Sequence, residues 1–189
     1  MLFRSDLSFI DAPPAATLQQ ARELLVMLGA LDSDGRLTAS GRALVDVPVH
    51  PRLAHMIATA EHRDRGLACA IAALLDDRDV MRGRPDDVPT DIAIRLRLAA
   101  GLGIDDRADG RAIERWRDRT EDLARRTGTP FSWADVEPDR AGALLLLAYP
   151  DRLAVRRQPG QFQMRNASAA WCRPTDSMAA EPFVVTEIG

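Results

Sequence analysis

A row of arginines on one side of a predicted helix is the pattern in this chain that most suggests binding chemistry. Residues 110–127 place charged and apolar side chains with a helical period. At about 100° per residue, four arginines fall on the same side, opposite the apolar residues. Guanidinium groups suit phosphate oxygens, so this side could follow a nucleic-acid backbone. The four residues are Arg111, Arg115, Arg119 and Arg126.

The same helix also permits a purely structural interpretation. Asp122 lies among the arginines and is spaced to pair with Arg126, as Glu121 is with Arg125. Ion pairs of this kind are common on the exposed face of any surface helix. The sequence therefore leaves open whether the arginines contact phosphates or only neighbouring carboxylates.

Aromatic residues are a second set of candidates, because nucleic-acid bases stack on their rings. Trp116 is expected in the core, since it shares a helix face with Ile113 and Leu123. Phe162 lies in the strand-like tail of the chain, after the helical part. Phe162 is therefore the best stacking candidate that the sequence offers.

The chain lacks the residue combinations of several enzyme classes. All 25 basic residues are arginines, and without lysine the P-loop of nucleotide hydrolases cannot form. His50, His55 and His62 lack the spacing of a helical metal pair, and Cys69 and Cys172 show no zinc or disulfide spacing. No serine lies in a Gly-x-Ser-x-Gly motif. We therefore predict no catalytic residue, no metal ligand and no cofactor on this chain.

The composition is that of a globular protein. Of 189 residues, 46% are hydrophobic and 28% are charged, with a formal net charge of −3. A chain of this length forms one large domain or two small ones. Because the net charge is slightly negative, any nucleic-acid surface must be a local patch. No apolar run is long enough to span a membrane and no signal peptide begins the chain, so we expect a cytoplasmic location.

The first part of the chain, residues 1–50, has the layout of a winged-helix unit. Asp11 is placed to cap a first helix, and an Asp-Gly pair marks a hairpin turn after that helix. Thr38 can cap a short second helix, and Pro48 and Pro51 are expected to end it.

The rest of the chain is expected to form a helical bundle and a β-rich tail. Residues 51–150 contain several helical patterns, and the apolar run at 66–75 predicts a central buried helix. Thr90 can cap the helix that follows. Residues 151–189 contain short strand-like segments, which indicate a β-rich segment that is only begun here. The predicted fold class is mainly α.

Several short motifs stand in a specific order in the first third of the chain. They are Asp11, Pro13 and Pro14, then residues 28–32, 35–38, 41–42 and 48–53. In combination they resemble the helicase-associated segment of DEAH-box RNA helicases, most closely the bacterial HrpB type. The resemblance implies a winged helix, a ratchet-like helical bundle and the start of an OB-like segment.

The resemblance also implies a role. In such helicases this region helps to guide single-stranded RNA, while separate motor domains bind ATP and Mg and hydrolyse ATP. The present chain lacks the P-loop lysine and the DEAH carboxylates of those motors, so the implied partners are RNA and motor domains in cis or in trans. Pro48, His50 and Pro51 match the segment that joins the winged helix to the bundle, and a structural hinge is implied there.

Two other functions remain open at this level. The chain could be a non-enzymatic scaffold for protein–protein contacts, built from a winged helix and a helical bundle. A DNA-binding regulator is a weaker variant, because the second helix at 39–45 offers only Arg42 as a groove contact.

Overall fold

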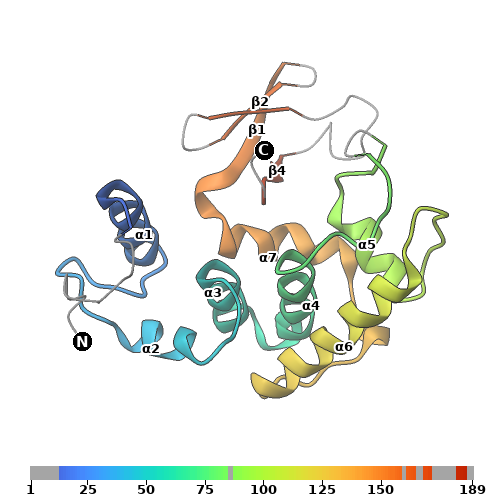
Figure 1. Ribbon diagram of the computed structural model, residues 1–189, viewed down its shortest axis with the longest axis horizontal. Helices are drawn as coiled ribbons and strands as arrows, with labels where there is room; N and C mark the ends of the chain where they lie inside the picture. The colour runs from blue at the N-terminus through green and yellow to red at the C-terminus, as the bar shows by residue number, and fades with distance from the viewer. Residues whose placement is uncertain (1–12, 85–86, 159–160, 165–167, 172–181, 187–189) are drawn as a thin grey trace.

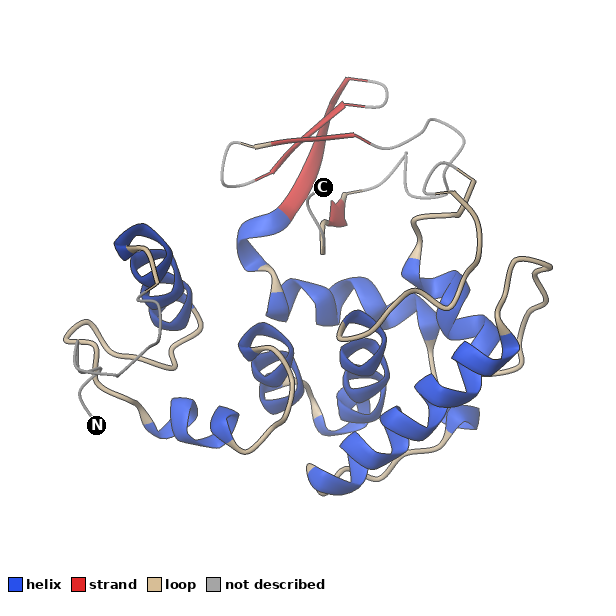
Figure 2. Cartoon of the chain, viewed as in Figure 1, coloured by secondary structure: helices blue, strands red, loops and turns tan. Residues whose placement is uncertain are grey.

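The structure is a computed structural model that describes residues 13–84, 87–158, 161–164, 168–171 and 182–186. A helical bundle forms its body, an N-terminal unit lies to one side and a small sheet lies above (Figure 1). Figure 2 shows the same arrangement by secondary structure, with helices dominating. The predicted fold class, mainly α with a short β tail, is confirmed.

The N-terminal unit begins with helix α1 (Ala15–Met27). Gly29 ends this helix with a positive φ of 65°, which favours glycine. A short hairpin follows, in which Leu31 pairs with Leu37 across the expected turn. The predicted cap of the first helix, Asp11, lies outside the described residues.

Helix α2 (Ala39–Val45) is fixed against the hairpin by its first residues. The Thr38 hydroxyl accepts a hydrogen bond from the Gly41 N–H (2.9 Å) and donates to the Gly29 carbonyl (2.7 Å), as expected of a cap. Gly41 itself is in close contact with the hairpin, because a Cβ there would lie 2.1 Å from the Ala30 carbonyl oxygen. Only glycine fits this approach without a shift of the backbone.

Helix α3 (Pro51–Thr59) starts where the second helix was expected to stop. The predicted role of Pro51 as a terminator is wrong: α2 already ends at Val45, and Pro51 is the first residue of α3. Proline is favoured there because the N–H it lacks would have no helical partner. His50 caps this helix, with Nδ1 accepting from the Arg52 N–H at 3.2 Å.

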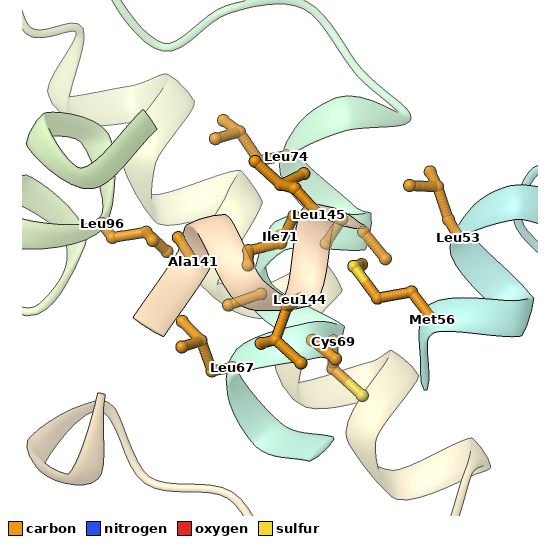
Figure 3. Close-up of a cluster of buried hydrophobic side chains, with 14 of the residues drawn as sticks. Leu53, Met56, Leu67, Cys69, Ile71, Leu74, Leu96, Ala141, Leu144 and Leu145 are labelled. Carbon is orange, nitrogen blue, oxygen red and sulfur yellow. The ribbon is translucent and has the colours of Figure 1, made fainter. Parts of the chain in front are cut away.

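Helix α4 (Arg65–Leu75) is the centre of the bundle, as its unbroken apolar run predicts. Every residue of α4 except the first and the last is buried. Helices α3, α6 (Gly110–Arg126) and α7 (Ala141–Ala148) pack around it. Figure 3 shows Ile71 of α4 facing Leu145 of α7 within this core.

Helix α5 (Ile92–Ala99) lies at the edge of the bundle. Its cap is Asp91, whose carboxylate accepts from the Ala93 N–H at 2.9 Å, and not Thr90 as predicted. Threonine and aspartate both cap helices, so the sequence pattern could not tell which of the neighbours Thr90 and Asp91 is the cap. Four single-turn 3-10 helices complete the helical part: His62–Asp64, Trp133–Asp135, Pro138–Arg140 and Pro150–Arg152.

A small antiparallel sheet with the strand order β3-β2-β1-β4 follows the bundle. Ala154, Phe162 and Met164 form its own small core, against which Phe183 packs. The strands are β1 (Leu153–Gln158), β2 (Gln161–Met164), β3 (Ala169–Trp171) and β4 (Phe183–Val184).

An ion pair joins the sheet to the bundle. Arg52 of α3 is 8% exposed and donates to both carboxylate oxygens of Asp151, at 2.6 and 3.0 Å. It also donates to the Ala148 carbonyl at 3.0 Å and lies 5.1 Å from the centre of the Tyr149 ring. Arg52 therefore connects the start of α3 to the end of α7 and the entry of β1.

Two kinds of feature are absent from the described part of the chain. No helix there is long and apolar enough to cross a lipid bilayer. The same residues contain no group of three or more side chains placed to hold a metal ion.

Candidate nucleic-acid interface

Helix α6 presents one face to the core and the other to solvent, as its pattern predicts. The Asp109 carboxylate starts the helix by accepting from the Arg111 and Ala112 N–H groups at 3.0 and 3.2 Å. Trp116 and Leu123 are buried, and the Trp116 indole N–H donates to the Ala70 carbonyl of α4 at 2.8 Å. The arginine row is thereby held on the outside of the bundle.

Arg119, the third residue of the row, is engaged by the end of α4. Its guanidinium donates to Asp77 at 2.6 Å and to Asp76 at 3.1 Å. The Arg78 N–H and then the Arg119 guanidinium lower the pKa of Asp77. The two aspartates that follow α4 thus anchor α6 to the bundle.

Arg126, the fourth residue of the row, is engaged within its own helix. It donates to Asp122 at 2.6 Å, and Arg125 donates to the other oxygen of that carboxylate at 2.9 Å. The hydrogen bond from Arg126 is the main reason that the pKa of Asp122 is lowered. The pairing of Asp122 with Arg126 occurs as its spacing suggests, whereas Arg125 also turns to Asp122 and not to Glu121.

Arg111 and Arg115 differ from the other two. Both are exposed, and neither forms an ion pair with any described residue. The structure therefore divides the predicted row into two residues that hold α6 in place and two whose guanidinium groups stay available to an external anion.

The segment between α2 and α3 and helix α6 line a groove of about 320 Å³. Pro48 and Val49 line one side of it, and Arg119 and Arg126 line the other. The sequence could not reveal this approach, since the two segments are far apart along the chain. The remaining lining residues are Ala73, Asp118, Asp122 and Leu123.

His50, for which the resemblance implies a hinge role, is the cap of α3 in the structure. Burial and the positive charge of Arg52 lower the pKa of this imidazole. A lowered pKa keeps the ring neutral near pH 7, and only a neutral ring offers Nδ1 as the acceptor for the Arg52 N–H.

Phe162 is not open to a base in this structure. Its ring is 2% exposed and lies 4.5 Å from the centre of the Phe183 ring, inside the small core of the sheet. Alternation along a strand predicts two faces, but it does not tell which of them is covered. In this structure the Phe162 ring is part of the core of the sheet and is not available for base stacking.

Three comparisons place the chain among known proteins. The family described as "Helicase associated domain (HA2), winged-helix" matches residues 21–49. The ATP-dependent RNA helicase HrpB of Escherichia coli (strain K12) is 30% identical over 186 residues, which is 97% of this chain and 20% of that protein. Two crystal structures of E. coli HrpB superpose with TM-scores of 0.67 and 0.72. Their identities are 26% and 27%, over 93% and 95% of this chain and 19% and 21% of the solved chains.

The predicted resemblance to HrpB-type helicases is confirmed.

The matched family model covers the second half of α1, the hairpin and α2, so the similarity to the helicase-associated winged-helix family lies in the N-terminal unit. The similarity to HrpB continues through the bundle and into the sheet. The chain spans about a fifth of the length of HrpB. It therefore corresponds to an accessory region and not to the whole of that helicase.

Two buried arginines in this HrpB-like bundle were not found from the sequence. Arg52 and Arg95 are both nearly inaccessible, and each forms two hydrogen bonds with one carboxylate, Asp151 and Asp79 respectively. The alternation of charged and apolar residues gives no signal for such pairs, because their partners lie far away in the sequence. Arg52 of α3 thereby holds the segment after α7, and Arg95 of α5 holds the segment after α4.

Proposed function

We propose that this chain is the nucleic-acid-guiding accessory region of an HrpB-type ATP-dependent RNA helicase. The observation that carries the proposal is the similarity of nearly the whole chain to a protein named as such a helicase. The chain has no lysine for a P-loop, so ATP and Mg would be bound by motor domains in the same polypeptide or in a partner. The place of action would be the cytoplasm.

The proposed organisation has three parts: a winged-helix unit at 1–50, a ratchet-like bundle at 51–150 and the start of an OB-like segment at 151–189. The first boundary is supported by Pro51, which is the first residue of α3. The second is supported by Leu153, which begins β1 after the last turn of the bundle.

RNA contact is proposed for the outer face of α6. Arg111 and Arg115 would bind phosphates directly, since no described carboxylate occupies them. Arg119 and Arg126 would reach a strand only by leaving their aspartates, so their main role is to hold the helix. Phosphate contacts position a strand without reading its bases, which suits a region that must accept RNA of any base sequence.

Contact with the motor domains is proposed for α1. This helix has no buried residue, and Leu18, Val26 and Met27 are exposed on it. Pro48, His50 and Pro51 would then serve as the hinge between the motor-bound winged unit and the bundle. Because α3 begins at Pro51 and is capped by His50, the proposed hinge ends at the first turn of that helix.

The proposal is tested by mixing this chain with a protein that carries the two motor domains and measuring RNA-dependent ATP hydrolysis. We expect stimulation by the chain, and no hydrolysis by the chain alone. Replacing Arg111 and Arg115 with glutamate should remove the stimulation, whereas the same change at Arg42 and Arg63 should not. Binding to the motor protein without any effect on RNA-dependent hydrolysis would overturn the RNA role and favour a protein–protein scaffold.

A further inference from the structure

The segment after α4, residues 76–84, runs alongside the first half of α6. At one end Asp77 holds Arg119, and at the other end Arg82 pairs with Asp109 at 2.8 Å. Between these pairs the backbone of the segment is tied to the start of α6: the Asp109 N–H donates to the Val80 carbonyl at 2.8 Å. Figure 1 shows the segment leading from the end of α4 toward the first turn of α6.

The lengths of the two elements agree with this arrangement. From Asp109 to Arg119 a helix rises about 15 Å, at 1.5 Å per residue. From Asp77 to Arg82 an extended chain covers about 16 Å, at roughly 3.3 Å per residue. The segment is therefore long enough to follow α6 from Arg119 back to Asp109, and Met81 forms an antiparallel bridge with Ala108, just before that helix.

Two arginines of this segment resemble Arg111 and Arg115 in their surroundings. Arg78 and Arg84 are exposed, and neither forms an ion pair with a described residue. Arg78 directly follows Asp77, whose pKa is lowered by the Arg78 N–H, by Arg119 and, more weakly, by the charge of Arg115. The guanidinium of Arg115 is thus near enough to this segment to act on its carboxylate. We call Arg78, Arg84, Arg111 and Arg115 the arginine strip.

Most carboxylates beside the arginine strip already have a positive partner. Asp79 is held by Arg95 and Asp105 by Arg107. Arg119 pairs with Asp76 and Asp77, and Arg82 pairs with Asp109, as described above. Two exposed carboxylates on α6, Glu114 and Asp118, have no such partner within the described residues and oppose an anion there. The strip nevertheless has four guanidinium groups, on two adjacent elements, that form no ion pair with any residue that the structure describes.

We propose that the segment 76–84 is a second part of the RNA contact surface. A single strand is then held by phosphate contacts from Arg78 and Arg84 on one side and from Arg111 and Arg115 on the other. This inference rests on the proposed RNA role of α6 and adds a separate element to it. The proximity of this segment to α6 could not be predicted from the sequence, because the pairing of Arg82 with Asp109 spans 27 positions.

The test is the salt dependence of binding between the full chain and a fluorescein-labelled single-stranded oligouridylate, followed by anisotropy. The first variant is Arg78→Glu with Arg84→Glu, and the second is Arg111→Glu with Arg115→Glu. Each should lower affinity on the order of tenfold and reduce the slope of log K against log salt by about 1.4, since each removes two phosphate contacts to a single strand. A control with the same change of net charge is Arg42→Glu with Arg63→Glu, both exposed and outside the strip.

The outcomes separate the two proposals. If only the α6 variant weakens binding, the proposed RNA contact by the segment 76–84 is overturned and the RNA role of α6 stands. If neither variant weakens binding, or the chain does not bind the oligouridylate at low salt, the RNA role itself is overturned together with the strip. If the control weakens binding as much as the segment variant, net charge explains the effect and the strip is overturned. The pair Arg78→Gln with Arg84→Gln repeats the test without charge reversal, should the glutamate variant lose its circular dichroism spectrum.

Discussion

The pair of Arg52 and Asp151 should be among the most important single interactions for the stability of this chain, and its two halves should not be equivalent. The Arg52 side chain is 10% exposed and that of Asp151 is 26% exposed. Removing one member of a buried pair costs about 3–5 kcal/mol because the other charge is left without compensation. The cost therefore depends on how well the remaining charge can be rehydrated.

Asp151→Asn leaves the more deeply buried charge behind. We expect this variant to lose about 3 kcal/mol of unfolding free energy, at the lower end of the range for buried pairs. Arg52→Met leaves a carboxylate that solvent reaches more easily and keeps most of the side-chain volume. It also loses the hydrogen bond to the Ala148 carbonyl, and we expect a cost of about 2 kcal/mol.

Urea unfolding followed by circular dichroism and tryptophan fluorescence measures both values. The matched control is Arg36→Met, which breaks the pair with Asp34, whose side chains are 68% and 66% exposed. That pair should contribute less than about 0.5 kcal/mol. The reasoning is refuted if Arg52→Met costs more than Asp151→Asn, or if neither differs from the control.

The same pair predicts a pH dependence with a definite sign. Burial alone raises the pKa of Asp151, but the hydrogen bonds and charge of Arg52 outweigh it and the pKa is lowered overall. A lowered folded-state pKa stabilises the protein above the unfolded value, near 3.9, and that stability is lost as pH falls through the folded value. The difference in unfolding free energy between the unmodified chain and Asp151→Asn should therefore be full at neutral pH and shrink below about pH 4. A difference that stays constant down to pH 2.5 would contradict the assignment.

Three further predictions concern other parts of the molecule. Asp118→Asn should raise the affinity for single-stranded RNA roughly threefold, because it removes a negative charge beside Arg111 and Arg115; Asp135→Asn is the control, and an unchanged affinity would contradict the expected path of the strand. Gly41→Ala should destabilise the winged unit by about 2 kcal/mol or more in urea unfolding, because its Cβ would lie 2.1 Å from the Ala30 carbonyl oxygen; Ser40→Ala should not, and equal stability of both variants would disprove the close approach. Limited proteolysis should cut first after residue 150, because the sheet buries only a small core of its own; a tail as resistant as α4 would show that it is an integral part of the bundle.

The local features of this fold could be predicted from the sequence where one physical cause dominates. The unbroken apolar run of α4 requires burial on all sides, and the structure places it at the centre. The outer face of α6 follows from its helical period alone. Thr38 can be identified as a cap because its hydroxyl, directly before a short helix, can accept from an N–H of the first turn.

Other features could not be predicted, because they depend on residues that are distant in the sequence or on a choice between neighbours. Pro51 can end one helix or begin the next, and only the position of His50 as a cap decides between them. Asp76 and Asp77 have the pattern of an ordinary solvated helix end until Arg119, 42 positions later, folds against them. The alternation around Phe162 gives the two faces of a strand without telling which one Phe183 covers.

The groove between residues 48–49 and α6 makes the stiffness of this helix relevant in addition to its charge. The helix has 17 residues and is about 25 Å long, and the main chain of such a helix behaves as a stiff rod. Its second half borders Pro48 and Val49 across the groove, while Arg111 and Arg115 lie in its first half. Trp116 and Arg119 also fasten this rod to α4. A movement of the winged unit toward the groove would therefore meet a fixed support. In this geometry α6 keeps Arg111 and Arg115 at a set distance from residues 48–49.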